Sequence, residues 1–357
     1  MIRIRTGKVL DIIEENINMQ IVNVEIDGIN ARAINYFSLT GRVDIDDVVQ
    51  LNTTAVNLGL GTGGYHFIIA NLRRKKTECN SRGHIIKMRY TPQQIKVLAV
   101  EEPDSPYYEN IKKFNSLNNI PVLIGFLHSM VLPALAGVRA VNEKLKISYV
   151  MTDGGALPIY FSNTVNILKK ERWLTGTVTV GHAFGGELEA INIYSGLAAA
   201  YSVQKADIII VAMGPGNVGT GTELGTTALE VGQIVNTVHS LGGQPIVIPR
   251  LSFQDQRHRH YGISHHVITV LKRIALAKST VVFPQLDDSN KKNILSDQIS
   301  NSKIGNLHNI VFENGYAGLT YLQNHKFEVS TMGRGVRQDT EFFLACCAAG
   351  SYTAKLV

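Results

Sequence analysis

The sequence contains few cysteines and few charged residues. Its three cysteines, Cys79, Cys346 and Cys347, are too few and too unevenly spaced for a disulfide framework or a four-ligand zinc site. The last two lie in the apolar run FFLACCAAG, where thiols behave as small buried hydrophobes. Only 18% of the 357 residues are charged and 45% are hydrophobic, which excludes a disordered chain and indicates a globular protein with a large core.

Long basic blocks are also missing. The net charge is +6, and the longest run of basic residues is Arg73-Arg74-Lys75-Lys76. This balance permits nucleic-acid binding without indicating it, and it fits a local anionic ligand equally well.

A targeting or membrane-spanning segment is not expected. The first 15 residues, MIRIRTGKVLDIIEE, interrupt their apolar run with charges and show no signal-peptide pattern, so we expect a cytoplasmic protein. Residues 120–138 form an uncharged run of 19 residues, which is the length of a membrane span. Its start, PVLI, favours a buried strand, and the residues from Met130 to Lys144 continue with the spacing of an amphipathic helix. We therefore interpret this run as a strand followed by a helix.

Residues 1–92 predict a small all-β domain. Short β-type runs such as IVNVEID and ARAINYF are separated by Asp-Gly, Thr-Gly and Gly-Thr-Gly-Gly signals, with no helix of convincing length. Such strands close into a barrel or a sandwich. The glycine-rich string GLGTGG at 59–64 joins two strand-like runs, so we interpret it as a loop.

Residues 93–357 predict an α/β domain. Apolar β-branched runs alternate with helical stretches, as a largely parallel sheet requires. We favour a doubly wound, Rossmann-like open sheet, with a (β/α)8-like barrel as the alternative. The predicted strands are IKVLAV at 95, PVLIGF at 121, ISYVM at 147, TVTVG at 177, DIIIVAM at 207, PIVIP at 245, TVVFP at 280 and NIVF at 309.

The strongest single signal is the segment DIIIVAMGPGNVGTGTELG at 207–225. A buried-strand pattern enters a Gly-x-Gly-x-x-Gly turn and then a helix-compatible stretch, an arrangement that suits an anion at a helix N-terminus. Close packing of two elements would also produce such a turn. A dinucleotide fingerprint further expects an acidic residue after the next strand, but that strand ends at Pro249-Arg250. The predicted ligand-binding residues here are Gly214, Gly216, Gly219, Thr220, Gly221 and Thr222.

The segment QDQRHRHYGISHH offers a second candidate anion site. We expect Ser264 to cap a helix that begins at His265, with Arg257 and Arg259 flanking its N-terminus as an anion clamp. Arg334, in the later motif STMGRG, could reach the same ligand. A solvated basic loop remains the alternative interpretation.

The same segment permits a metal site. In an extended conformation His258 and His260 would project to one side. With Asp255 or a later histidine, they would offer a divalent metal three ligands and an open position. No complete metal-ligand spacing is present.

Proton-transfer candidates follow two other strands. His182 and Glu187 lie in GHAFGGELE, and Asp153 follows the preceding strand, so all three are candidate catalytic residues at the carboxyl edge of the sheet. Glu187 and Glu189 would equally suit the first turn of a helix, where they would complement its dipole.

Three motifs together resemble a known family. MGPGNVGTGT at 213, RHRHYGISHH at 257 and TMGRG at 331 resemble an uncharacterised bacterial family catalogued as a domain of unknown function. The resemblance implies a bacterial cytoplasmic protein and no assigned activity.

These observations predict a protein that binds an anionic, phosphorylated or nucleotide-like small molecule at the carboxyl edge of an α/β sheet. Whether it is an enzyme stays open. The alternatives are a non-catalytic binding or regulatory module and a metal-dependent hydrolase that uses His258 and His260. The cofactor would be a nucleotide-like ligand or a divalent metal, no nucleic acid or membrane partner is indicated, and a homo-oligomer is compatible with the sequence.

Overall fold

The computed structural model describes the chain except for residues 1, 75, 77 and 79–81. Cys79 and Lys75, which entered the arguments about disulfides and basic runs, lie outside the described residues. The chain divides into two compact units, Met1–Leu98 and Ala99–Val357. Each unit has its own hydrophobic core, as a domain requires.

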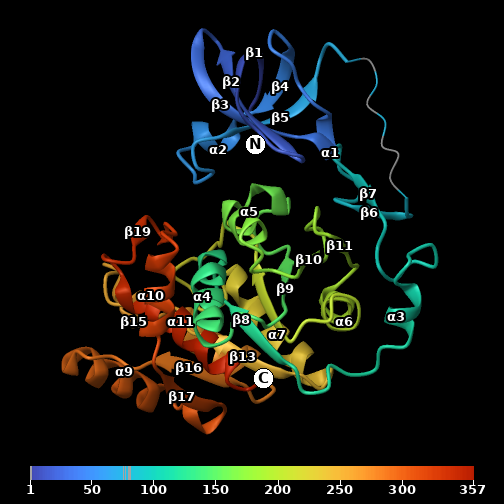
Figure 1. The fold of residues 1–357 in the computed structure, drawn as a ribbon. Helices are drawn as coiled ribbons and strands as arrows, with labels where there is room; N and C mark the ends of the chain where they lie inside the picture. Colours follow the sequence, from blue (N-terminus) through green and yellow to red (C-terminus); the bar gives the residue numbers. More distant parts are fainter. Residues whose placement is uncertain (1, 75, 77, 79–81) are drawn as a thin grey trace. The chain divides into compact units, whose positions relative to one another are not determined.

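The first unit contains a closed barrel with strand order β1-β2-β3-β5-β4 (Figure 1). Asp27 and Gly28 form the tight turn between β2 and β3, and both have positive φ angles, as this class of hairpin turn requires. The sequence predicted a small N-terminal β domain, either a barrel or a sandwich, and the structure shows that it is a barrel. Its strands are β1 (Ile4–Glu15), β2 (Met19–Ile26), β3 (Ile29–Tyr36), β4 (Val48–Asn52) and β5 (His66–Asn71), with short helices α1 (Phe37–Thr40) and α2 (Thr54–Asn57).

The second unit is built on an open, fully parallel sheet of eight strands in the order β11-β10-β9-β12-β8-β13-β16-β17. The predicted parallel α/β sheet is confirmed. The alternative of a closed (β/α)8-like barrel is wrong, because the sheet is open, with β11 and β17 as its outermost strands. The strands are β8 (Pro121–Gly125), β9 (Ile147–Thr152), β10 (Gly176–Thr179), β11 (Leu188–Glu189), β12 (Ile208–Met213), β13 (Gln244–Ile248), β16 (Thr280–Pro284) and β17 (Asn309–Glu313).

One predicted sheet strand lies elsewhere. The run IKVLAV forms β7 (Ile95–Val97), which pairs antiparallel with β6 (Ile85–Lys87) outside the large sheet. The eighth sheet strand is instead β11, whose two residues are too few for a periodicity signal. Two further small sheets pair β14 (Leu251–Ser252) with β15 (Gly262–Ile263) and β18 (Ser330–Thr331) with β19 (Arg334–Gly335).

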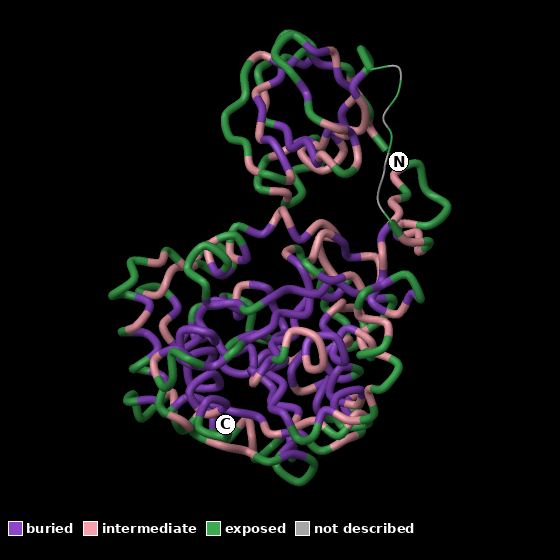
Figure 2. The backbone as a smooth tube through the Cα atoms, turned by 45° about the vertical axis from the view of Figure 1, so that its right-hand side comes forward, coloured by how far each residue is buried: buried purple, intermediate pink, exposed green. Residues whose placement is uncertain are grey.

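A buried C-terminal helix packs on the sheet. Helix α11 (Thr340–Ala354) contacts β8, β13 and β16, and α4 (Val131–Val141) and α10 (Tyr316–Asn324) pack on α11. Buried residues run through the strands and these helices (Figure 2). The remaining helices are α3 (Tyr108–Lys112), α5 (Asn163–Lys170), α6 (Ile193–Ser202), α7 (Glu230–Ser240), α8 (His265–Thr269), the π-helix η5 (Val270–Ile274) and α9 (Ser289–Ser302).

The uncharged run at 120–138 folds as a strand and a helix, as predicted. It forms β8, the short turn η1 (His128–Met130) and most of α4. Helix α4 is buried from Val131 to Arg139, so it is a core helix and not the amphipathic helix that we expected. Among the described residues, no helix has the length and apolarity needed to cross a membrane.

Two glycines allow α4 and α11 to approach closely. A Cβ atom at Gly350 would overlap the carbonyl oxygen of Ala134, and one at Gly137 would overlap that of Cys347. Burial raises the pKa of the Cys347 thiol, so it stays protonated in this interface.

We expect Gly350→Ala to lower the free energy of unfolding by about 2 kcal/mol or more, because the added methyl forces α4 and α11 apart. Chemical denaturation checks this. Gly305→Ala is the control, since a Cβ there makes only an ordinary contact with Ile310. Equal stability of the two variants would contradict close helix packing.

Candidate functional site

A pocket of about 540 Å³ lies at the carboxyl edge of the second unit's sheet. Its floor follows three neighbouring strands, because the residues after β8, β12 and β13 all contribute to the wall. These strands belong to different parts of the chain, and parallel pairing makes them all end at the same edge. The pocket residues after the three strands are Leu127, His128 and Ser129, then Pro215, Gly216, Asn217 and Gly219, and then Arg250.

The glycine-rich segment forms a long loop instead of a tight strand-to-helix turn. Strand β12 ends at Met213 and α7 begins only at Glu230, preceded by the 3₁₀ turn η3 (Thr227–Leu229). Within the loop, the residues fold back on themselves through a bridge between Gly219 and Thr226. The expectation that Gly214, Gly216 and Gly219 lead directly into a helix is therefore wrong. Backbone N–H groups later in the loop, such as that of Thr220, instead bond carbonyl groups of the same loop.

The six ligand-binding residues predicted in this loop separate into two groups. Gly216 and Gly219 line the pocket, and Gly216 has a φ of 105°, which glycine adopts readily. Gly214 packs against Ala156, where a Cβ would overlap the carbonyl oxygen. The exposed stretch Thr220 to Thr222, which includes Gly221, is not part of the pocket wall.

The loop between β14 and β15 carries the charged wall of the pocket. The two strands pair antiparallel, and the backbone N–H of Ser264 donates to the carbonyl of Arg250 at 3.0 Å. Asp255 is buried, accepts two side-chain hydrogen bonds from Arg257 at 2.7 and 2.8 Å, and accepts one from Arg250 at 3.2 Å. The Arg257 guanidinium holds the pKa of Asp255 well below its usual range. Both carboxylate oxygens of Asp255 therefore accept hydrogen bonds from the two arginines. Asp255 does not belong to the group of described residues that could hold a metal ion, which was the role that we predicted.

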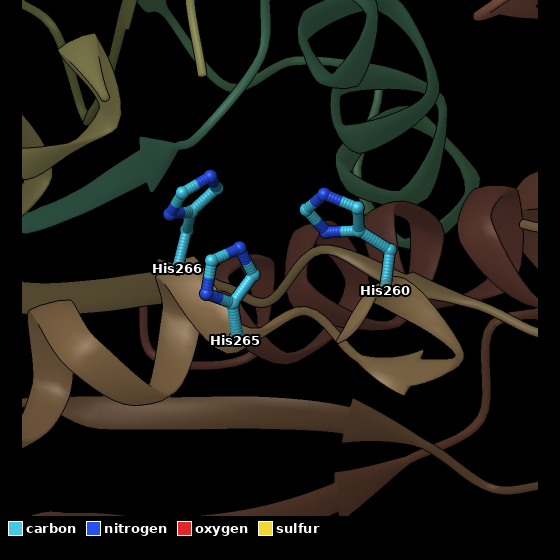
Figure 3. Close-up of side chains that lie close together, drawn as sticks. All are labelled: His260, His265 and His266. Atoms are coloured by element: carbon cyan, nitrogen blue, oxygen red, sulfur yellow. The ribbon is translucent and has the colours of Figure 1, made fainter. Parts of the chain in front are cut away.

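Three histidines converge beside these arginines. His260, His265 and His266 each place a ring nitrogen so that the three atoms lie within 4.8 Å of one another (Figure 3). His260 and His266 are only 3% exposed and line the pocket, and Gly219 leaves room for the His266 ring. His258 is exposed and stands outside the cluster, because residues 258–260 form a 3₁₀ turn and not the extended segment that we expected.

The histidine environment favours neutral rings. Burial, with the positive charges of Arg250 and Arg257, lowers the pKa of His260 to about 3. Burial and the neighbouring positive groups lower the pKa of His266 to about 4, and burial also lowers that of His265. At neutral pH each ring is therefore uncharged and keeps one nitrogen lone pair.

Ser264 occupies the predicted position at the start of α8 but performs a different task. It is the N-cap residue, yet its side chain makes no capping bond. Its buried hydroxyl instead hydrogen-bonds Nδ1 of His260 at 2.8 Å. This contact orients the His260 ring.

A buried histidine that sequence reasoning did not select also lines the pocket. His128 Nε2 lies 2.6 Å from the Ser162 hydroxyl, and Nδ1 lies 3.1 Å from the Tyr149 hydroxyl. Burial lowers the pKa of His128 to about 4, so the ring is neutral at physiological pH. Ser129, the next residue, hydrogen-bonds the Thr331 hydroxyl at 3.1 Å. In the sequence, the signal that could have identified His128 and Ser129 as pocket residues was their position shortly after strand β8.

The predicted proton-transfer residues are not part of the pocket wall. Asp153 is exposed and accepts a hydrogen bond from the backbone N–H of His182 at 2.8 Å. Glu187 forms an exposed ion pair with Lys169. Parallel strands bring these residues to the predicted edge of the sheet, but the side chains of Asp153 and Glu187 are engaged by neighbouring groups outside the pocket.

Arg334, the last predicted ligand-binding residue, donates to the buried carboxylate of Asp339 at 3.0 Å. Asp339 also accepts hydrogen bonds from the Ser252 hydroxyl, so it ties the TMGRG motif to β14. Arg334 is not among the residues of the pocket wall, although Thr331 and Met332 of the same motif are.

An unpredicted carboxyl group is Glu230, at the first position of α7. It accepts a hydrogen bond from the Thr152 hydroxyl at 2.7 Å and lies beside Gly154. Burial, with the nearby charge of Asp153, raises its pKa from 4.5 to about 7. The sequence shows only an acid in the first turn of a helix, which is common, so burial is what distinguishes it.

We expect Glu230 to make folding stability fall as pH rises. The folded protein keeps a proton on Glu230 that the unfolded chain releases above its ordinary pKa of 4.5, so its contribution declines from there through about pH 7. Relative to wild type, Glu230→Gln should gain about 1–3 kcal/mol between about pH 5 and pH 8. Urea unfolding at both pH values measures this. Glu223→Gln is the control, because Glu223 is an exposed acid. If the difference in unfolding free energy between Glu230→Gln and the wild type did not change with pH, the raised pKa would be contradicted.

Comparisons with known proteins agree with the resemblance in the three motifs. No curated protein and no solved structure matches the chain significantly. One family profile matches residues 32–350, which is most of the chain and includes the pocket segments. The chain therefore belongs to the family described as Protein of unknown function (DUF3866).

Proposed function

We propose that the second unit binds an anionic small molecule, phosphorylated or nucleotide-like, in the pocket at the carboxyl edge of its sheet. The observation that carries this proposal is the pair of arginines in the wall. Arg250 is 8% exposed, and Arg257 lies on the same carboxylate. Keeping a guanidinium largely out of water is unfavourable unless anionic partners compensate its charge.

Asp255 compensates only part of this charge. One carboxylate shares its two oxygens between two guanidinium groups, so one unit of positive charge remains at the wall. A guanidinium has five N–H donors, and Asp255 receives one from Arg250 and two from Arg257. The remaining donors suit the oxygens of a phosphate or carboxylate. Among the described residues that line the pocket, Glu328, which is exposed, is the acidic one.

The other walls of the pocket supply neutral polar groups, and at Gly216 they leave room for a ligand to approach the backbone. Asn217, Ser129 and Thr331 contribute amide and hydroxyl groups, and Gly216 has no atom within 4 Å of its Cβ position. A small polar molecule with a negative end suits such a pocket better than an apolar one.

The position in the sheet also supports a ligand site. We propose a doubly wound, Rossmann-like arrangement, in which ligands bind where neighbouring strands lead to opposite sides of the sheet. Strand β8 leads to β9 on one side, and its neighbour β13 leads to β16 on the other. A dinucleotide site of the usual kind is disfavoured, because the glycine loop does not lead directly into a helix.

The structure gives more support to ligand binding than to a catalytic role for Asp153, His182 and Glu187. None of these three lines the pocket, and two of them are held by local partners. We therefore place a binding or regulatory role ahead of an enzyme that uses these residues.

We expect the protein to bind phosphate-bearing probes, and Arg250→Gln to weaken this binding about 10-fold or more, because a charge-assisted hydrogen bond is lost. Isothermal titration calorimetry with inorganic phosphate, pyrophosphate and a nucleoside diphosphate measures the affinity.

Arg259→Gln is the matched control, since Arg259 is exposed, lies in the same loop and is not part of the pocket wall. Its affinity should equal that of the wild type. Thermal unfolding of each variant confirms that the fold is kept. Failure of the wild type to bind any probe, or equal weakening by both substitutions, would refute the proposal.

A further inference from the structure

We infer that His260, His265 and His266 bind a divalent metal ion of the zinc class at the wall of the pocket. The sequence suggested His258 and His260 with Asp255 or a later histidine; this ligand set keeps His260, omits His258 and Asp255, and uses two histidines of α8. The inference goes beyond the proposed anion binding and stands on separate observations.

The first observation is the geometry of the rings. One nitrogen of each ring lies within 4.8 Å of the other two (Figure 3). Zinc–nitrogen bonds of about 2.0–2.1 Å in tetrahedral geometry hold nitrogens about 3.4 Å apart. The proposed site therefore requires side-chain rotations that bring the three nitrogens closer together by about 1 Å.

The second observation is the lack of other partners for two ring nitrogens. His265 Nε2 and His266 Nδ1 are buried and make no hydrogen bond within the described part of the chain. A buried polar atom without a partner is costly and uncommon. A metal ion bound by the three rings would give such nitrogens a bonding partner.

The third observation is the support behind His260. Its Nδ1 hydrogen-bonds the buried Ser264 hydroxyl at 2.8 Å. When Nδ1 donates this bond, Nε2 carries the lone pair that a metal ligand needs. Metal-bound histidines are commonly oriented by such a partner on the other nitrogen.

The ligand types select the class of metal. Three imidazoles suit zinc and related transition metals, whereas magnesium and calcium prefer oxygen ligands. Three protein ligands also leave a coordination position open. His260 and His266 line the pocket, so this position is available to an anionic oxygen, and that last step rests on the proposed function. The arginines at the same wall make an anion the favoured fourth ligand.

The test uses the full chain without a polyhistidine tag, treated with a chelator and kept in phosphate-free buffer. Equilibrium dialysis with Zn²⁺ should give one tightly bound ion per chain. Co²⁺ should produce the visible absorption of a tetrahedral, nitrogen-bound site. His265→Ala and His266→Ala should each weaken metal binding more than 10-fold, and Ser264→Ala about 10- to 100-fold, the range for a residue that orients a ligand.

His258→Ala is the matched control, because this exposed histidine lies in the same segment outside the cluster. It should bind Zn²⁺ as the wild type does. Absence of stoichiometric binding by the wild type overturns the inference whether or not any variant folds. Equal losses in His258→Ala and His266→Ala indicate only adventitious binding and also overturn it. Because no phosphate is present, neither outcome bears on the phosphate titrations.

Discussion

The parallel pairing of β8 with both β12 and β13 is the constraint on which the pocket depends. Parallel strands all end at the same edge of a sheet, so the residues after these three strands meet although they are far apart in sequence. The strands themselves are almost entirely buried and carry no chemistry. They hold the loops in place, and the buried helix α11 covers β8, β13 and β16. The polar wall is therefore built on a rigid apolar base.

One short segment supplies most of the charge and the ring nitrogens of that wall. Antiparallel pairing of β14 with β15 returns the chain to Arg250 and starts α8 at His265. This return brings the Asp255 carboxylate and the histidine cluster to the same side of the pocket. Burial, together with the positive charges of the arginines, keeps the rings neutral, and the Asp255 carboxylate keeps Arg250 and Arg257 in position. Anion binding and metal binding are compatible here, because a metal with three neutral ligands retains its positive charge.

Several parts of this arrangement follow from local patterns. Alternating buried strands and helices predicted the parallel sheet, and Asp27-Gly28 predicted a hairpin in the barrel. Of the predicted site residues, Gly216, Gly219, Arg257 and His260 line the pocket. The glycine loop and the 3₁₀ turn at His258 were not predicted, although the hydrogen bonds that form them are local. Glu230 was missed because its environment comes from a distant part of the chain, namely Thr152 at the end of β9 and Asp153 directly after it.

The sequence by itself determined the class of fold and the edge of the sheet at which polar residues gather, because these depend on hydrophobic periodicity and on the direction of parallel strands. Only the tertiary structure decided which polar side chains share a space. Asp153 and Glu187 reach the correct edge but are engaged locally, whereas His265 and His266 join His260. That choice depends on side-chain packing and on competing hydrogen bonds between segments, which no local pattern records.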